Sequence, residues 1–151
     1  MEIKILVVDD EIDFMETIVN RLNKRGLEAT GASSGEQALE FIDAKIFDVV
    51  ILDIKMPGGM DGIETLKEIK KKQPLCEVIL LTGHGTVETS VDGMKLGAFD
   101  YLLKPAQFEE LCEKIAQAYE RKMAQDERIK KANIQKLLRF PGRVFEQEKE
   151  K

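Results

Sequence analysis

The 151-residue sequence contains one histidine, two cysteines and no tryptophan. Neither Cys76 nor Cys112 has a second cysteine or a histidine at metal-site spacing, so we expect two reduced, mostly buried thiols. No apolar run approaches the ~20 residues of a membrane-spanning helix, which argues against membrane insertion. The first ten residues, MEIKILVVDD, lack the basic start and cleavage site of a signal peptide, which favours a cytoplasmic protein.

The composition fits one folded domain with an appendage, since 43% of the residues are hydrophobic and 34% are charged. The net charge of -5 is unevenly distributed. Residues 1–119 carry 13 basic and 22 acidic side chains, whereas residues 120–151 carry 10 basic and 6 acidic ones. Because nucleic-acid phosphates are bound by clustered lysine and arginine, the acidic body argues against direct contact with nucleic acid.

Apolar, β-branched runs alternate with segments of helical spacing. The runs cover residues 3–8, 49–52, 78–82 and 101–103, with a weaker run at 27–32. Such continuous runs are typical of strands buried on both faces, and the alternation predicts five βα units forming a parallel sheet covered by helices on both faces.

Helix-capping residues agree with this division. Ser34 with Gln37 three residues later predicts a helix start, and Gly97 predicts a helix end. An aspartate among residues 10–13 is expected to cap the first helix. That capping role is also the simplest alternative for Asp10 and its neighbour Asp9.

Polar residues follow four of the predicted strands. Asp9 and Asp10 follow the first strand, Asp53 the third, Thr82 ends the fourth, and Lys104 follows the fifth. The carboxyl ends of parallel strands meet at one sheet edge, where open α/β sheets bind their ligands. These five side chains are therefore expected to face one crevice.

Three carboxylates in one crevice repel one another unless a cation or a raised pKa relieves them. Oxygen ligands of this number, with water, suit Mg²⁺ better than Ca²⁺. A lysine and a hydroxyl opposite the metal suit an anion, and a phosphoryl group in transfer needs such an electrostatic clamp. The pattern thus favours phosphoryl chemistry.

Four segments carry a family resemblance: VVDDE, LDIKMPGGMDG, LLTGHG and GAFDYLLKP. From Lys4 to about Tyr119 the sequence resembles the receiver domain of bacterial two-component response regulators. The resemblance implies a flavodoxin-like doubly wound fold with strand order 2-1-3-4-5. It also implies a phosphoprotein of a phosphorelay that accepts phosphoryl from a sensor histidine kinase or phosphotransfer protein and is no turnover enzyme.

The resemblance assigns roles to the residues of the crevice. It implies that Asp53 is the phosphoacceptor and that Mg²⁺ is bound by Asp10, Asp53 and the main-chain carbonyl of Lys55, with Asp9 reaching the ion through water.

Further along the chain, the resemblance implies that Thr82 and Lys104 bind the phosphoryl oxygens. Tyr101 would change position on activation, and the signal would pass through the surface of the fourth helix, fifth strand and fifth helix to a downstream protein. The Lys104–Pro105 peptide bond would be cis.

One departure from the family pattern and two alternative functions remain. The loop reads MPGGMDG, one glycine longer at Gly58 or Gly59 than is usual in the family, which should loosen it without moving Asp53. A phosphatase of the haloacid-dehalogenase kind would need an acid at position 55, which is lysine. A flavin or nucleotide carrier would need a phosphate-binding loop where DDEID stands.

His84, the only histidine, lies two residues beyond Thr82. It is interpreted as a solvent-facing loop residue, with a role in tuning the phosphate lifetime as the alternative.

The C-terminal part is expected to differ from the rest. We divide the chain into a receiver, 1–121, and a charged, partly helical extension, 122–151, without an output domain, which predicts a stand-alone receiver. Residues 128–143 hold six basic side chains and no acid, with Ile134, Leu137 and Leu138 at helical spacing. This piece is either a solvated continuation of the last helix or a docking element for an acidic surface on its own body, on a second copy in a homodimer, or on a kinase.

Overall fold

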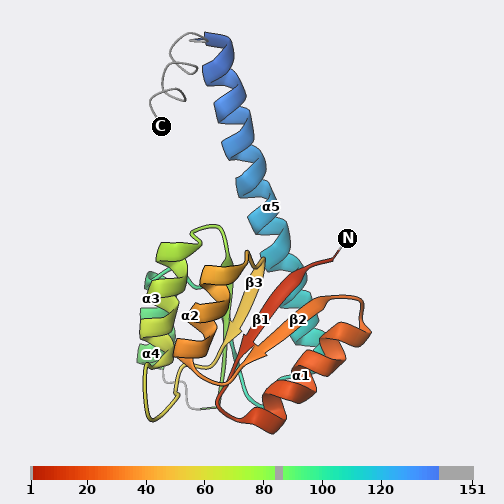
Figure 1. Ribbon diagram of the computed structural model, residues 1–151, viewed down its shortest axis with the longest axis vertical. Helices are drawn as coiled ribbons and strands as arrows, with labels where there is room; N and C mark the ends of the chain where they lie inside the picture. The colour runs from red at the N-terminus through yellow and green to blue at the C-terminus, as the bar shows by residue number, and fades with distance from the viewer. Residues whose placement is uncertain (1, 84–86, 140–151) are drawn as a thin grey trace.

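The computed structural model describes residues 2–83 and 87–139. Strands and helices alternate along them in ten elements: β1 (Lys4–Val8), α1 (Ile12–Lys24), β2 (Glu28–Ala32), α2 (Gly35–Ala44), β3 (Val49–Leu52), α3 (Gly62–Lys72), β4 (Glu77–Thr82), α4 (Val87–Lys95), β5 (Asp100–Leu103) and α5 (Phe108–Arg139). The strands form one parallel sheet in the order β2-β1-β3-β4-β5 (Figure 1). The predicted flavodoxin-like fold and its strand order are confirmed.

The sheet separates two apolar cores because side chains alternate between its faces along each strand. Ile5 and Val7 of β1 pack against α1 and α5. Leu6 and Val8 lie on the other face, against α2 and α3. Helix α4 joins that second layer, as Figure 1 shows, since a Cβ on its Gly93 would meet the side chain of Leu80.

Two of the three predicted helix caps are present. The hydroxyl of Ser34 accepts a hydrogen bond from the main-chain N–H of Gln37 at 3.1 Å, at the start of α2. Gly97, after α4, has a φ of +102°, which favours glycine. The predicted cap of the first helix is wrong, because α1 begins after Glu11, whose side chain makes no capping bond. The aspartates nearby are thus available for another role.

Helix α5 is 32 residues long, about 48 Å at 1.5 Å per residue. Only its first part is buried against the sheet, through Phe108, Leu111, Ile115 and Ala118. The rest projects from the body (Figure 1), and the helix continues unbroken through the predicted boundary at residues 121 and 122. None of the helices in 2–83 and 87–139 combines the length and apolarity needed to cross a bilayer.

Candidate functional site

Two aspartates are placed side by side by neighbouring strands. Asp9 directly follows β1 and Asp53 directly follows β3. The main-chain N–H of Asp53 donates to the carbonyl of Val8 at 3.0 Å, which extends the β1–β3 ladder to the acids themselves. Both are buried, with 2% and 3% of their surface exposed. The sheet therefore holds two carboxylates at its carboxyl edge, the edge at which the strands end.

Asp10 completes a cluster of three carboxylates. One oxygen each from Asp9, Asp10 and Asp53 lie within 4.8 Å of one another, and Asp10 is the most open of the three to solvent. The cluster borders an open pocket of about 280 Å³. This pocket is lined by Asp10, Glu11, Asp53, Lys55 and Pro57. A small ion or anion can therefore reach the carboxylates from solvent.

Lys104 supplies positive charge to this cluster. Its Nζ lies 2.7 Å from Oδ2 of Asp9, 3.5 Å from the Glu11 carboxylate and 3.9 Å from Oδ2 of Asp53. Nζ also lies 4.3 Å from the centre of the Phe14 ring, a favourable cation–π distance. Burial opposes the charge on Lys104, but the hydrogen bond that Lys104 donates to Asp9 and the negative charges of the surrounding carboxylates outweigh this effect and raise the pKa of Lys104. The lysine is held charged at the edge of the pocket.

The negative charges of the aspartates are less fully balanced by their neighbours than the positive charge of Lys104. Burial raises the pKa of Asp9, and the negative charge of Asp53 adds to this. The hydrogen bonds from Lys104 and from the main-chain N–H of Glu11 act in the opposite direction without cancelling the rise. One lysine thus faces an excess of negative charge that a bound cation would relieve.

The donor set fits a hard divalent cation. All candidate ligands are oxygens, which suits Mg²⁺ with several waters retained. Both oxygens of Asp9 already accept hydrogen bonds, from Glu11 and Lys104. Asp10 and Asp53, which line the open pocket, are therefore the better placed carboxylates for direct ligation.

The other expected site residues also have defined positions. Thr82 ends β4 and is fully buried, and its main-chain carbonyl accepts a hydrogen bond from the N–H of Lys104 at 2.9 Å. The Lys104–Pro105 peptide bond is cis, as the resemblance implied. Tyr101 lies on the outermost strand, β5, and is 41% exposed. Thr82 and Lys104 thus share the carboxyl edge with the aspartates, whereas Tyr101 lies at the side of the sheet.

The loop after Asp53 is closely packed against the chain at one glycine and is open to solvent at another. The N–H of Gly62 donates to the carbonyl of Ile54 at 2.8 Å, and a Cβ on Gly62 would lie 2.2 Å from the carbonyl oxygen of Asp53. Gly58 has a φ of +87° with open space around it. The loop therefore takes up its extra glycine on the solvent side, while Gly62 keeps it close to the end of β3.

Three site neighbours escaped the sequence-based prediction. Glu11 and Phe14 contact Lys104, and Glu36 of α2 accepts a hydrogen bond from the N–H of Met60 at 2.7 Å. The bond from Met60 lowers the pKa of Glu36. Glu11 lies within the segment VVDDE and Phe14 lies three residues further on, whereas nothing in the sequence linked residues 36 and 60. His84 lies outside the described residues.

Comparison with known families agrees with this geometry. The model of the response regulator receiver domain matches residues 5–116. The chain belongs to this family. The receiver is 45% identical over 109 residues to the transcriptional regulatory protein ZraR of Escherichia coli O157:H7, covering 72% of this chain and 24% of ZraR. It is 44% identical over 104 residues to a putative NtrX-like response regulator of Rickettsia bellii, covering 68% and 22%. The chain spans about a quarter of the length of these curated relatives.

Solved receiver structures resemble the chain over nearly their whole length. A receiver domain protein from Clostridium thermocellum is 41% identical, with a TM-score of 0.76, and the match covers 82% of this chain and 98% of that one. A CheY-like receiver from Methanospirillum hungatei is 30% identical, with a TM-score of 0.79, and the match covers 83% and 99%. The matched portion is thus a complete receiver unit.

Proposed function

We propose that the chain accepts a phosphoryl group on Asp53 from the phosphohistidine of a sensor kinase or phosphotransfer protein. The observation that carries the proposal is the cluster of Asp9, Asp10 and Asp53 beside Lys104 in an open pocket. Membership of the receiver family supports it, because receivers are phosphorylated by histidine kinases and are typically not turnover enzymes.

In the proposed reaction a carboxylate oxygen of Asp53 attacks phosphorus, the new P–O bond forms, and the P–N bond breaks with its electron pair leaving on the imidazole. Lys104 and Thr82 hold oxygens of the phosphoryl group, and Lys104 already approaches Asp53 to 3.9 Å. Asp10, Asp53 and the carbonyl of Lys55 would hold Mg²⁺, with Asp9 acting through water. The ion would neutralise charge on the transferring group.

The signal would leave through the surface of α4, β5 and α5. Three exposed side chains support this surface as the route of the signal. Tyr101, Val91 and Met94 are 41%, 45% and 42% exposed, and together they line one shallow apolar pocket. We propose a downstream protein partner for this surface. The division into a receiver, 1–121, and an extension, 122–151, stays part of the proposal.

The test is incubation with Mg²⁺ and a small-molecule phosphodonor, followed by intact mass measurement. One phosphoryl group should add to the wild-type chain. Chelation should prevent the addition, and Asp53→Asn should abolish it, whereas Asp43→Asn, a change at a surface ion pair with Lys72, should have no effect. Full labelling of the Asp53→Asn variant would show that another residue is the acceptor.

A further inference from the structure

The ammonium group of Lys104 has no position fixed by the main chain alone. The main-chain N–H of Lys104 donates to the carbonyl of Thr82 at 2.9 Å, which anchors the residue directly beyond β5. From there a flexible four-carbon stem carries the charge, and such a stem can also extend into solvent. The Lys104 side chain is nevertheless only 13% exposed. Its neighbours therefore decide where the charge lies.

Three carboxylates attract this ammonium with unequal strength. Asp9 accepts a short hydrogen bond at 2.7 Å, whereas the carboxylates of Glu11 and Asp53 lie 3.5 Å and 3.9 Å from Nζ. The Glu11 side chain is 62% exposed, so solvent screens its attraction. A cation bound among the aspartates would compete with Lys104 for Asp9 and Asp53. The carboxylates alone would then hold the lysine less firmly.

The fourth neighbour of the ammonium is an aromatic ring. Nζ of Lys104 lies 4.3 Å from the centre of the Phe14 ring, within the ~6 Å over which an aromatic face attracts a cation. The attraction arises from the quadrupole of the ring, which carries no net charge. A cation held by the aspartates therefore leaves this attraction in place.

Core packing alone does not require an aromatic residue at this position. Phe14, Ile18 and Leu22 recur every four residues and face the core on the α1 side of the sheet. Ile18 and Leu22 are buried, with 8% and 0% of their surface exposed, whereas Phe14 is half-buried at the end of this row. An aliphatic side chain would continue the row equally well. The aromatic face is what distinguishes Phe14, and Lys104 lies over that face.

We infer that Phe14 is a positioning residue, whose ring holds the ammonium of Lys104 at the edge of the pocket for the incoming phosphoryl group. The inference rests on the proposed function, in which Lys104 holds an oxygen of the group transferred to Asp53. Nζ already lies 3.9 Å from Oδ2 of Asp53, so a lysine kept in place by the ring loses little freedom when the phosphoryl group arrives. Preorganisation of this kind lowers the barrier of a transfer that depends on electrostatic stabilisation.

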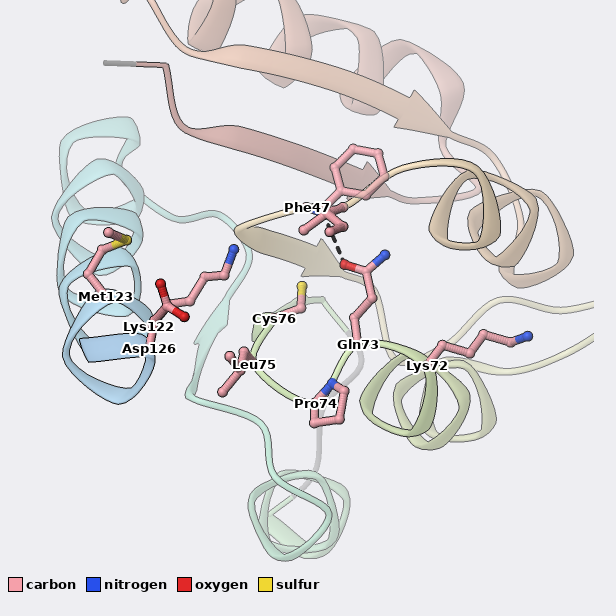
Figure 2. A pocket seen from close by; sticks show the side chains of 10 residues that line it. Phe47, Lys72, Gln73, Pro74, Leu75, Cys76, Lys122, Met123 and Asp126 are labelled. Carbon is pink, nitrogen blue, oxygen red and sulfur yellow. Dashed lines mark hydrogen bonds between the residues drawn. The ribbon is translucent and has the colours of Figure 1, made fainter. Parts of the chain in front are cut away.

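A second lysine lies over a phenylalanine at the opposite edge of the sheet. Nζ of Lys45 is 5.1 Å from the centre of the Phe47 ring. Phe47 is fully buried just before β3, and its N–H donates to Oε1 of Gln73 at 3.0 Å, the dashed line in Figure 2. It borders a pocket of about 370 Å³ near the starts of β3 and β4, away from the aspartates that follow β1 and β3. Phe47→Leu is therefore the matched control, because it removes a ring beside a lysine without touching the site.

The rate of phosphorylation tests the positioning role. With Mg²⁺ and an excess of a small-molecule phosphodonor, Phe14→Leu should be labelled at least about threefold more slowly than the wild type, because Lys104 loses the attraction of the ring. Phe14→Tyr keeps an aromatic face and should retain a rate close to that of the wild type. Phe47→Leu should be labelled at the wild-type rate. An unchanged rate in Phe14→Leu, or the same slowing in Phe14→Tyr or Phe47→Leu, would overturn the inference.

Proton NMR of the Lys104 side chain tests the contact without phosphorylation. The Cε methylene is bonded to Nζ, so the ring current of Phe14 should shift its protons upfield. The signal, identified by its loss in Lys104→Arg, should keep this shift in Phe14→Tyr and after addition of Mg²⁺, and should lose it in Phe14→Leu. Absence of the shift from the wild type would overturn the inference even if Asp53 is labelled. A wild type that shows the shift but takes no label would refute the proposed function, and with it the role of Phe14 in that function.

Discussion

Strand β3 has an aspartate at each end, and the two have opposite surroundings. Asp48, before the strand, accepts hydrogen bonds from Nζ of Lys122 at 2.6 Å and from the N–H of Lys4 at 2.8 Å. Asp53, after the strand, lies among other acids, with Nζ of Lys104 only within 3.9 Å. The same side chain therefore stabilises the fold at one edge of the sheet and is kept available at the other.

The strand next to β3 also begins with a buried acid that has cations beside it, although its Oε2 accepts no hydrogen bond among the described residues. Glu77, at the start of β4, is 3% exposed and lies 3.8 Å from Lys70 and 3.4 Å from Arg121. Balanced charges therefore collect where the strands begin, and unbalanced charges where they end. The difference indicates that the carboxyl edge sacrifices some stability for binding.

Matched substitutions at the two ends of β3 should give the largest effects. Asp53→Asn should abolish phosphorylation and leave the free energy of unfolding unchanged or higher, because it removes repulsion among the acids. Asp48→Asn should leave phosphorylation intact and lower the free energy of unfolding by about 1 to 2 kcal/mol, because a charge-assisted hydrogen bond is weakened. Intact mass and urea unfolding measure the two quantities. Similar stability losses in both variants would remove the contrast.

Added Mg²⁺ should act at the carboxyl edge alone. An ion that binds only the folded chain stabilises it by about 1.4 kcal/mol at ten times its dissociation constant. The thermal midpoint of the wild type and of Asp48→Asn should therefore rise with Mg²⁺, and that of Asp10→Asn should rise much less. An equal rise in Asp10→Asn would place the ion elsewhere.

The contrast between the two edges was only partly predictable. Asp9, Asp10, Asp53, Thr82 and Lys104 could be placed together from the sequence, because each directly ends or follows an apolar run and parallel strands end at one edge. The pairing of Asp48 with Lys122 could not, since Lys122 lies within the last helix and follows no strand that would place it at a sheet edge. Its formation depends on how far α5 runs past the sheet.

The helix boundaries show the same limit. No glycine or proline occurs between residues 108 and 140, so a continuous helix was compatible with the sequence. The division of the chain into a receiver, 1–121, and a partly helical extension, 122–151, therefore falls inside this helix. The change of charge occurs within one helix and marks a change of surroundings, not the end of an element.

Hydrogen exchange should show that the two edges of the sheet differ in their dynamics. Helix α4 is nine residues long and contains Val87, Thr89, Ser90, Val91 and Gly93, all poor helix formers. We expect it to exchange faster than α1, and to change most on phosphorylation together with Tyr101. Amides near Asp48 should not change. Equal protection of α4 and α1, with no response to phosphorylation, would contradict this expectation.

The smallest effect is expected at Glu36, which ties α2 to the loop after the phosphoacceptor. The Glu36 carboxylate accepts a hydrogen bond from the N–H of Met60, and this bond lowers the pKa of Glu36 below the ordinary value of 4.5. The stabilisation is therefore present above about pH 4.5 and is lost as the pH falls through the lowered pKa. Glu36→Ala should lower the thermal midpoint near neutral pH by on the order of 1 °C, and the difference from wild type should shrink in acid. Glu36→Gln, whose amide oxygen can still accept the bond, should lose less at neutral pH. If Glu36→Ala lowered the thermal midpoint equally at neutral and acid pH, the carboxylate charge would not be what holds the loop.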